Sequence, residues 1–550
     1  MRSGLRRITG KRTGWRALLA VVAMSAGIAL TPTVASAATP TIDTLTPSSG
    51  GVGAMVTIAG SGFTEVTDVS FPGAAATFTV VSDIEITTSV PAGAMTGPVL
   101  VTTPDGSVVG PDFTVIPIDH IVILMEENHS FDNVLGKFCA EVAIGTLVRK
   151  GANMACDGAT TGMLTTGTII PLSDAVDFVP NAGHDVKAQK VAMNGGLMNG
   201  FSAMSLCTAA VSPAYRCYTQ FDPLRVPSSI ANVSSLATSY AVSDRTFESA
   251  VAPSWVGHNL LVNPTMNGFD GNNPLPSKST TQTGPGWGCD SFKDANWWNG
   301  TTYVRQPSCI PDVLGSGPYR PSPVPYIPTI FDRLEAAGRS WKIYGGDGVT
   351  GGSGWLWTIC PTFYECAGST QRQNLVASRQ ILDDAAQGHL PDFSIVTPTW
   401  AQSQHNLSSM TKGDNWIGSV VKAIQSNPSS WNHTAIFVSW DDCGCFYDHV
   451  PPPVAGWGIR VPMIIASPFA RPGFTDSNNA SSASLLAFTE HTYGLAPFNT
   501  ADATAYDYAA SFNFSGGVGV VGAPAMVHTH TTSRTRAAAL AHPPDEDDPT

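Results

Sequence analysis

The sequence predicts an α/β protein in which a mostly parallel sheet is sandwiched by helices and preceded by a small Ig-like β-sandwich. Short apolar runs end abruptly in polar residues at 121–125 and 435–440, which is typical of buried parallel strands. Helical patterns alternate with further apolar runs through most of the chain. Between residues 39 and 116 charges are few and turn residues recur about every 8–12 positions, which is typical of a sandwich.

Residues 1–37 are predicted to be a signal peptide. Six basic residues precede the apolar run 17–30, and Ala35-Ser36-Ala37 supplies small residues for cleavage. A membrane anchor is the alternative, but the run is short and contains glycine. Arg6-Arg7 also permits twin-arginine export. We therefore expect a secreted, extracellular protein without a transmembrane anchor.

Without the leader the chain is strongly acidic. The full chain has 29 Lys+Arg and 42 Asp+Glu, so loss of the six leader residues leaves 23 basic residues and a net charge of −19. This balance excludes a nucleic-acid partner, because phosphate-backbone binding needs clustered cations. It also disfavours adhesion to anionic membranes. A phosphate ester can still bind where a metal ion supplies local positive charge.

The ten cysteines suggest disulfides, since the count is even and the chain is expected to be exported. Pairing of sequence neighbours would give 139–156, 207–217, 289–309 and 360–366, although spacing cannot fix connectivity. Cys443 and Cys445 could be a metal or redox pair. No zinc-like spacing supports that interpretation, and a local or longer-range disulfide is favoured.

The β-rich segment 39–116 resembles the IPT/TIG family of Ig-like domains. The resemblance rests on LTPSSG at 45–50, VTIAGSGF at 56–63 and DFTV at 112–115. It implies a spacer or a module that contacts carbohydrate, protein or a cell surface. The segment has no His or Cys and its carboxylates are scattered, so we expect no chemistry there.

A catalytic domain is predicted over residues 118–526. The segment 267–328 is rich in Gly, Pro, Asn and Trp with little periodicity, which indicates an inserted lid or binding loop. Residues 527–550 are predicted to be a disordered tail. Helix-to-strand patterns occur at 228–247, 330–345, 374–398 and 414–442, followed by a strand at 461–469 and a helix at 482–495.

Four oxygen-bearing residues follow the two apolar runs. Glu127 and Asn128 come after the first run, and Asp441 and Asp442 after the second. Because ligands of parallel sheets bind beyond the carboxyl ends of the strands, these residues predict a metal site at one edge. Hard oxygen donors suit one divalent ion such as Mg, Ca or Mn. The alternative for an acidic pair is a helix cap or an exposed turn.

Ser254, after Pro253, is the candidate nucleophile, since a serine beside a metal can be ionised and attack phosphorus. A turn is the alternative reading of Pro-Ser. No GxSxG elbow surrounds it, which disfavours an acyl hydrolase. His184 and His405 could donate to a phosphoryl oxygen or protonate a leaving group, or they could be structural. His449 could simply anchor a loop.

Several motifs in the same order resemble the bacterial phosphoesterase family, which holds phosphatidylcholine-preferring phospholipases C and acid phosphatases. They are MEENHSFDNVLG (125–136), GHD…GGLMNGF (183–201), RTFESAVAPSWVGHNLL (245–261), DDCGCFYDHVPPP (441–453) and GIRVPMIIASPFARPG (458–473). The resemblance implies an alkaline-phosphatase-like fold. It also implies metal ligands at Glu127, Asn128, Ser254, Asp441 and Asp442, a nucleophile at Ser254, and phosphoryl contacts from Asn128, His184 and His405.

The expected activity is hydrolysis of phosphate mono- or diesters, of acid phosphatase or phospholipase C type. Trp287, Trp297 and Trp298 in the insertion could form an aromatic cage for a choline head group, although a structural role is favoured. The alternative function is a non-catalytic secreted binding or adhesion protein with a degenerate core.

Overall fold

The computed structural model describes residues 39–149, 151, 154–208, 215–317, 319–514 and 524–530. The predicted signal peptide lies outside these residues. Within the described part of the chain, no helix has both the length and the apolar character needed to span a bilayer.

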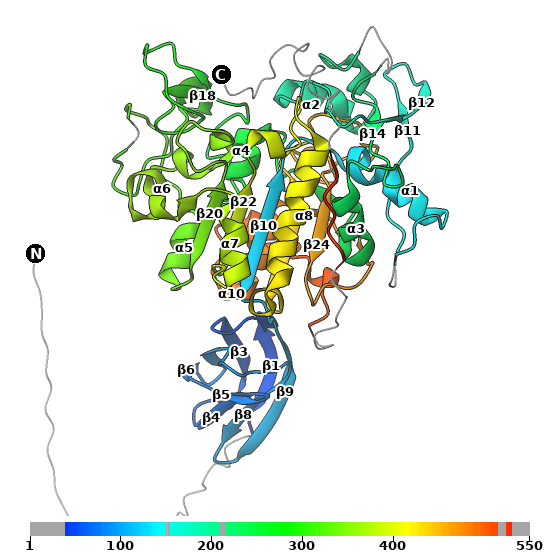
Figure 1. The fold of residues 1–550 in the computed structure, drawn as a ribbon. Coiled ribbons are helices and arrows are strands. Elements are labelled where there is room, and N and C mark those ends of the chain that lie inside the picture. Colours follow the sequence, from blue (N-terminus) through cyan, green and yellow to red (C-terminus); the bar gives the residue numbers. More distant parts are fainter. Residues whose placement is uncertain are drawn as a thin grey trace, which may run out of the picture. The chain divides into compact units, whose positions relative to one another are not determined.

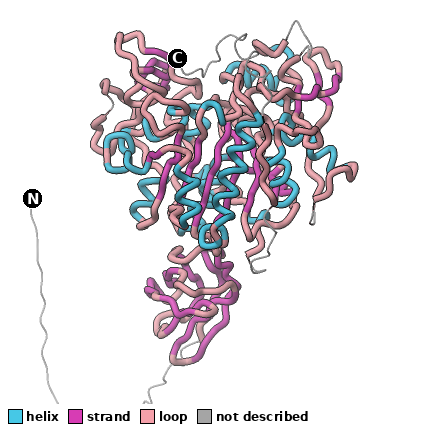
Figure 2. Tube along the Cα trace, viewed as in Figure 1, coloured by secondary structure: helices cyan, strands magenta, loops and turns pink. Residues whose placement is uncertain are grey.

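The N-terminal segment forms the predicted β-sandwich, built entirely of strands and loops (Figure 2). Its core holds Val56, Ile58, Ile86, Val101 and Phe113, all almost fully buried. One sheet has the order β1 (Thr41–Thr46), β3 (Met55–Ser61), β7 (Glu85–Ser89), β6 (Phe78–Ser82). The other has the order β2 (Ser49–Gly50), β9 (Gly106–Val115), β8 (Gly97–Thr103), β4 (Asp68–Phe71), β5 (Ala74–Ala76).

The larger part of the chain is organised around an eight-stranded sheet (Figure 1). Pairing shows that seven strands run in one direction and β24 in the other, so the sheet is mostly parallel, as predicted. The order is β21 (Leu375–Val376), β20 (Trp341–Gly345), β22 (Phe393–Thr397), β10 (His120–Glu126), β23 (Thr434–Trp440), β24 (Met463–Ala466), β15 (Ala241–Ser243), β25 (Thr475–Asp476).

Both faces of this sheet are buried. Along β10, Ile121 and Ile123 belong to one apolar cluster, whereas Val122 and Leu124 belong to another. Alternate residues of a strand face opposite sides, so the two clusters are two core layers. The first is covered by α4 (Ser254–Asn259), α5 (Ile330–Ala336) and α10 (Ser482–Tyr493). The second is covered by α3 (Ala231–Ser239), α7 (Gln380–Gln387) and α8 (Met410–Ser426); α7 and α8 run along the front of the sheet in Figure 1.

The predicted helix-to-strand units are confirmed as α3–β15, α5–β20, α7–β22 and α8–β23. Shorter elements occupy the connections. They are η1 (Asp132–Gly136), α1 (Lys137–Ala143), β11 (Thr161–Met163), β12 (Ile169–Pro171), β13 (Ser173–Asp174), α2 (Val186–Met193), β14 (Thr219–Gln220), β16 (Thr246–Phe247), α6 (Tyr364–Gly368), α9 (Pro428–Trp431), β26 (Ala480–Ser481) and α11 (Thr500–Ala503).

The segment predicted to be an insertion contains a small antiparallel sheet of β17 (Leu275–Pro276), β18 (Lys293–Trp298) and β19 (Tyr303–Pro307). Its tryptophans do not form a common cage. Trp287 is buried in the core, and Trp297 packs against the core and donates to the carbonyl of Asn267. Trp298 is 44% exposed beside Tyr303. Since neighbouring strand residues face opposite sides, Trp297 and Trp298 cannot enclose one ligand.

All ten cysteines are paired. The four neighbour pairings are present as predicted, and Cys443 bonds to Cys445 rather than to a distant partner.

Two residues at the start of the predicted disordered tail make defined contacts with the catalytic domain. Val527 exchanges two hydrogen bonds with the side chain of Asn232, and Thr529 exchanges two with that of Asn415. The side-chain amides thus satisfy the backbone N–H and C=O groups of both residues, as a neighbouring strand would. The rest of the predicted tail, from 531, lies outside the described residues.

Candidate active site

The central strands deliver the four predicted oxygen ligands to one place. β10 and β23 pair in parallel with Glu126 opposite Trp440, so the residues that follow each strand are neighbours. The backbone N–H of Asn128 donates to Asp441 Oδ1 at 2.8 Å, and the N–H of Asp441 donates to the Glu126 carbonyl at 3.1 Å. Segments over 300 positions apart are therefore joined directly at the sheet edge.

The turn after β23 packs closely on Asn128, which is in the left-handed region with φ of 64°. Gly444 also has a positive φ, 59°, and a Cβ at this position would collide with the Asn128 carbonyl. Its N–H donates to Asp442 Oδ1 at 2.7 Å. A glycine is thus needed here, both for the backbone conformation and to let the turn orient Asp442.

Ser254 is the first residue of α4, directly after Pro253, and its side chain is fully buried. Its Oγ lies 3.4 Å from the side-chain amide of Asn128 and 3.5 Å from Asp442 Oδ2. The predicted nucleophile therefore contacts residues from both strand ends.

His184 and His405 face the same amide from the other side. Nδ1 of each ring is held by a backbone carbonyl, Ala182 at 3.0 Å and Asn406 at 2.8 Å, which turns Nε2 toward the site. Nε2 of His184 lies 3.5 Å from the Asn128 amide. The oxygen of that amide faces Ser254 Oγ and the Asp442 carboxylate, a group of oxygens suited to a cation. Only in the reversed orientation would Asn128 donate to Asp442 at 3.2 Å and accept from His405 Nε2 at 2.8 Å.

A divalent cation fits this set of side chains. Glu127, His258 and Asp441 each offer a ligand atom within 4.8 Å of the others, and all three are buried. Oδ2 of Asp441 accepts no hydrogen bond from the described residues. Burial, together with the charges of Asp442 and Asp441, raises the pKa of the nearby Glu248 carboxyl well above its usual range. Crowded buried carboxylates of this kind call for a cation.

Sequence reasoning missed His258. It follows Ser254 by four positions on α4, so both side chains lie on one face of the helix. That i, i+4 spacing was the available signal. Trp400 was also missed. Its half-buried ring lies 4.5 Å from the His405 ring and stacks on the fully buried Trp357 at 5.5 Å.

A second acidic group lies beside the site but is already neutralised. Asp132 and Asp448 are fully buried around the guanidinium of Arg460, with contacts of 3.1 Å to each. His449 bonds to Asp132 at 2.6 Å and to Asp157 at 3.0 Å. This arrangement bears out the loop-anchoring interpretation of His449, because its contacts hold the loop after β23 to the rest of the fold.

Comparison with known proteins agrees with the architecture. The profile of the IPT/TIG domain matches residues 40–115. The chain is 23% identical over 480 residues to a non-hemolytic phospholipase C of Burkholderia pseudomallei, covering 73% of this chain and 60% of that relative. It is 24% identical over 453 residues to phospholipase C A of Mycobacterium tuberculosis, covering 72% and 78%.

A plant relative, non-specific phospholipase C6 of Arabidopsis thaliana, is 23% identical over 390 residues, covering 65% of this chain and 63% of that protein. The alignments thus span less than two thirds of the Burkholderia and Arabidopsis relatives. The profile of the phosphoesterase family matches residues 118–496, which is the sheet, its helices and every site residue described above. The chain belongs to the phosphoesterase family.

Proposed function

We propose that the protein is an exported, metal-dependent phosphoesterase that hydrolyses phosphate esters through Ser254. The observation that carries the proposal is the position of Ser254 Oγ, 3.4 Å from the Asn128 amide and 3.5 Å from Asp442. The relatives are named as phospholipases C, and the five disulfides are consistent with folding in an oxidising compartment.

In this proposal Glu127, Asn128, Ser254, Asp441 and Asp442 hold one divalent ion. When bound, the ion supplies positive charge that favours the serine alkoxide and the phosphoryl oxygens. The Ser254 hydroxyl loses its proton and its Oγ attacks phosphorus, the P–O bond to the leaving alcohol breaks as that oxygen takes up a proton, and a phosphoserine (from a monoester) or a seryl phosphodiester (from a diester) forms. The Nε2 atoms of His184 and His405 hold the phosphoryl oxygens as charge develops. Water then attacks phosphorus, the bond to Ser254 breaks, and phosphate or a phosphomonoester leaves.

Trp400 favours an ester with a cationic or aromatic alcohol group. Its half-buried ring lies against His405, beside the proposed phosphoryl position, and Trp357 fixes it by stacking. An aromatic face attracts a quaternary ammonium group. A choline phosphodiester is therefore the substrate class that this side of the site suits best.

The test compares hydrolysis of p-nitrophenyl phosphate and p-nitrophenyl phosphorylcholine by the wild type and by Ser254→Ala. We expect the variant to lose at least about 10³-fold in kcat on both substrates. Ser249→Ala is the matched control, since this hydroxyl, on the same loop, bonds to Ser482 at 2.6 Å. It should retain activity.

The rival function, a non-catalytic binding protein with a degenerate core, makes the opposite prediction. It requires that the wild type hydrolyse neither ester with any added divalent ion. Unchanged activity in Ser254→Ala would instead show that the protein is an enzyme whose nucleophile is not Ser254.

A further inference from the structure

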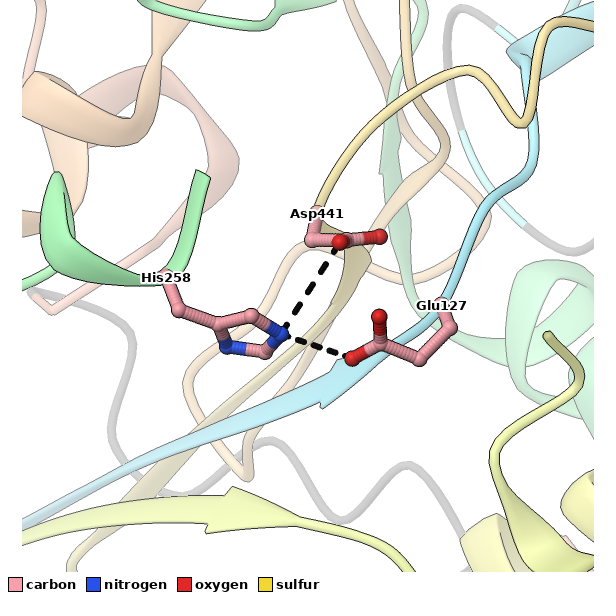
Figure 3. Close-up of side chains that lie close together, drawn as sticks. All are labelled: Glu127, His258 and Asp441. Carbon is pink, nitrogen blue, oxygen red and sulfur yellow. Dashed lines mark hydrogen bonds and ion pairs between the residues drawn. The ribbon is translucent and has the colours of Figure 1, made fainter. Parts of the chain in front are cut away.

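His258 occupies a position that the all-oxygen ligand set does not explain. Its Nε2 lies 2.7 Å from Glu127 Oε1 and 3.8 Å from Asp441 Oδ2. Figure 3 shows the ring pointing at both carboxylates, which come from the ends of two different strands. The side chain is only 2% exposed, so water has little access to these contacts.

The distances between His258 Nε2 and the two carboxylates are compatible with all three groups binding one ion. Ligand atoms bound at about 2.0–2.2 Å from a metal lie roughly 2.8–3.6 Å apart in octahedral to tetrahedral geometry. The distances from His258 Nε2 to its two carboxylate neighbours, 2.7 and 3.8 Å, lie on either side of that range. Small side-chain rotations would therefore bring all three atoms around one cation. Asp441 Oδ2, which is buried and accepts no hydrogen bond from the described residues, supplies an available ligand.

The second acidic group differs from this one in how its charge is balanced. Asp132, Asp448 and His449 also bring ligand atoms within 4.8 Å of one another. There the guanidinium of Arg460 lies between the carboxylates and provides the positive charge, so no metal ion is needed. At Glu127 and Asp441 the corresponding neighbour is an imidazole, which can bind a metal.

We propose that His258 Nε2 is a direct ligand of the divalent ion, so that the site is a mixed nitrogen and oxygen centre. This inference rests on the proposed metal-dependent function. It changes the expected ion, because imidazole nitrogen favours Zn, Fe or Ni over Mg, Ca and Mn. The alternative role for His258 is to position Glu127 by a hydrogen bond without touching the ion.

The two possible roles of His258, direct ligand or positioning residue, predict different selectivity of the site among metal ions. The full chain is stripped of metal, dialysed against an equimolar mixture of Mg, Ca, Mn and Zn, and its metal content is measured. The wild type should retain close to one ion, with Zn enriched over Mg, Ca and Mn. His258→Gln should lower the Zn-to-Mg ratio at least about tenfold, because an amide oxygen replaces nitrogen. His449→Asn is the matched control and should leave the ratio unchanged.

A spectroscopic measurement does not depend on the variant's folding. Pulsed EPR of the Mn-loaded wild type should show coupling to a directly bound nitrogen, and this coupling should be absent in His258→Gln and present in His449→Asn. Absence of nitrogen coupling in the wild type would overturn the inference, as would an equal loss of affinity for all four ions in His258→Gln. If the wild type retains no ion at all, the proposed metal dependence itself is wrong.

Discussion

Replacing His449 with asparagine should destabilise the protein below pH 6.5 and have little effect above pH 9. Burial opposes the charged form of this ring, but the hydrogen bond and charge of Asp132 outweigh it and raise the pKa from 6.5 to about 9. A pKa raised in the folded state stabilises the fold fully below the unfolded value of 6.5. That contribution is lost as the pH rises through about 9. The raised pKa corresponds to roughly 3 kcal/mol at most.

The assay is urea unfolding of the wild type and His449→Asn at pH 6, 7.5 and 9.5. We expect the difference in unfolding free energy to fall from a few kcal/mol at pH 6 to below about 1 kcal/mol at pH 9.5. His433→Asn, at a half-exposed ring 3.5 Å from Asp119, should cost little at any pH. An equal cost of His449→Asn at all three pH values would refute the reasoning, since the charge of the ring would then contribute nothing.

Three further predictions concern the site. Removal of metal by a chelator should lower Tm by a few degrees, and a divalent ion should restore it, as expected for a ligand that binds only the folded state; an unchanged Tm would argue against a bound ion. Gly444→Ala should cost at least about 2 kcal/mol and weaken metal binding, because its Cβ collides with Asn128; normal stability would contradict the packing. Trp400→Ala should lower kcat/KM for p-nitrophenyl phosphorylcholine about 5–30-fold and for p-nitrophenyl phosphate much less; equal losses would remove its role in recognising the choline group.

The ends of β10 and β23 were predictable, because a buried strand must end where an apolar run is followed directly by acidic residues. The direction of β24 was not, since an apolar run indicates a buried strand but not which way it runs. Ser254 could be selected through a family resemblance, whereas its contact with Asp442 required the tertiary fold. His258 was missed because its one local signal, the spacing of four residues from Ser254, is common in any helix, and its contact with Glu127, 131 positions earlier, required the tertiary fold.

The pairing of β10 with β23 also bears on when the proposed metal site can form. Glu127 and Asp441 become neighbours only after most of the chain has been synthesised and the centre of the sheet has closed. Before these two strands have paired, the two carboxylates are therefore not held together. Under the proposed function, the compartment in which this strand pair forms would determine which ions compete for the centre, so the proposed export would also influence which metal is bound.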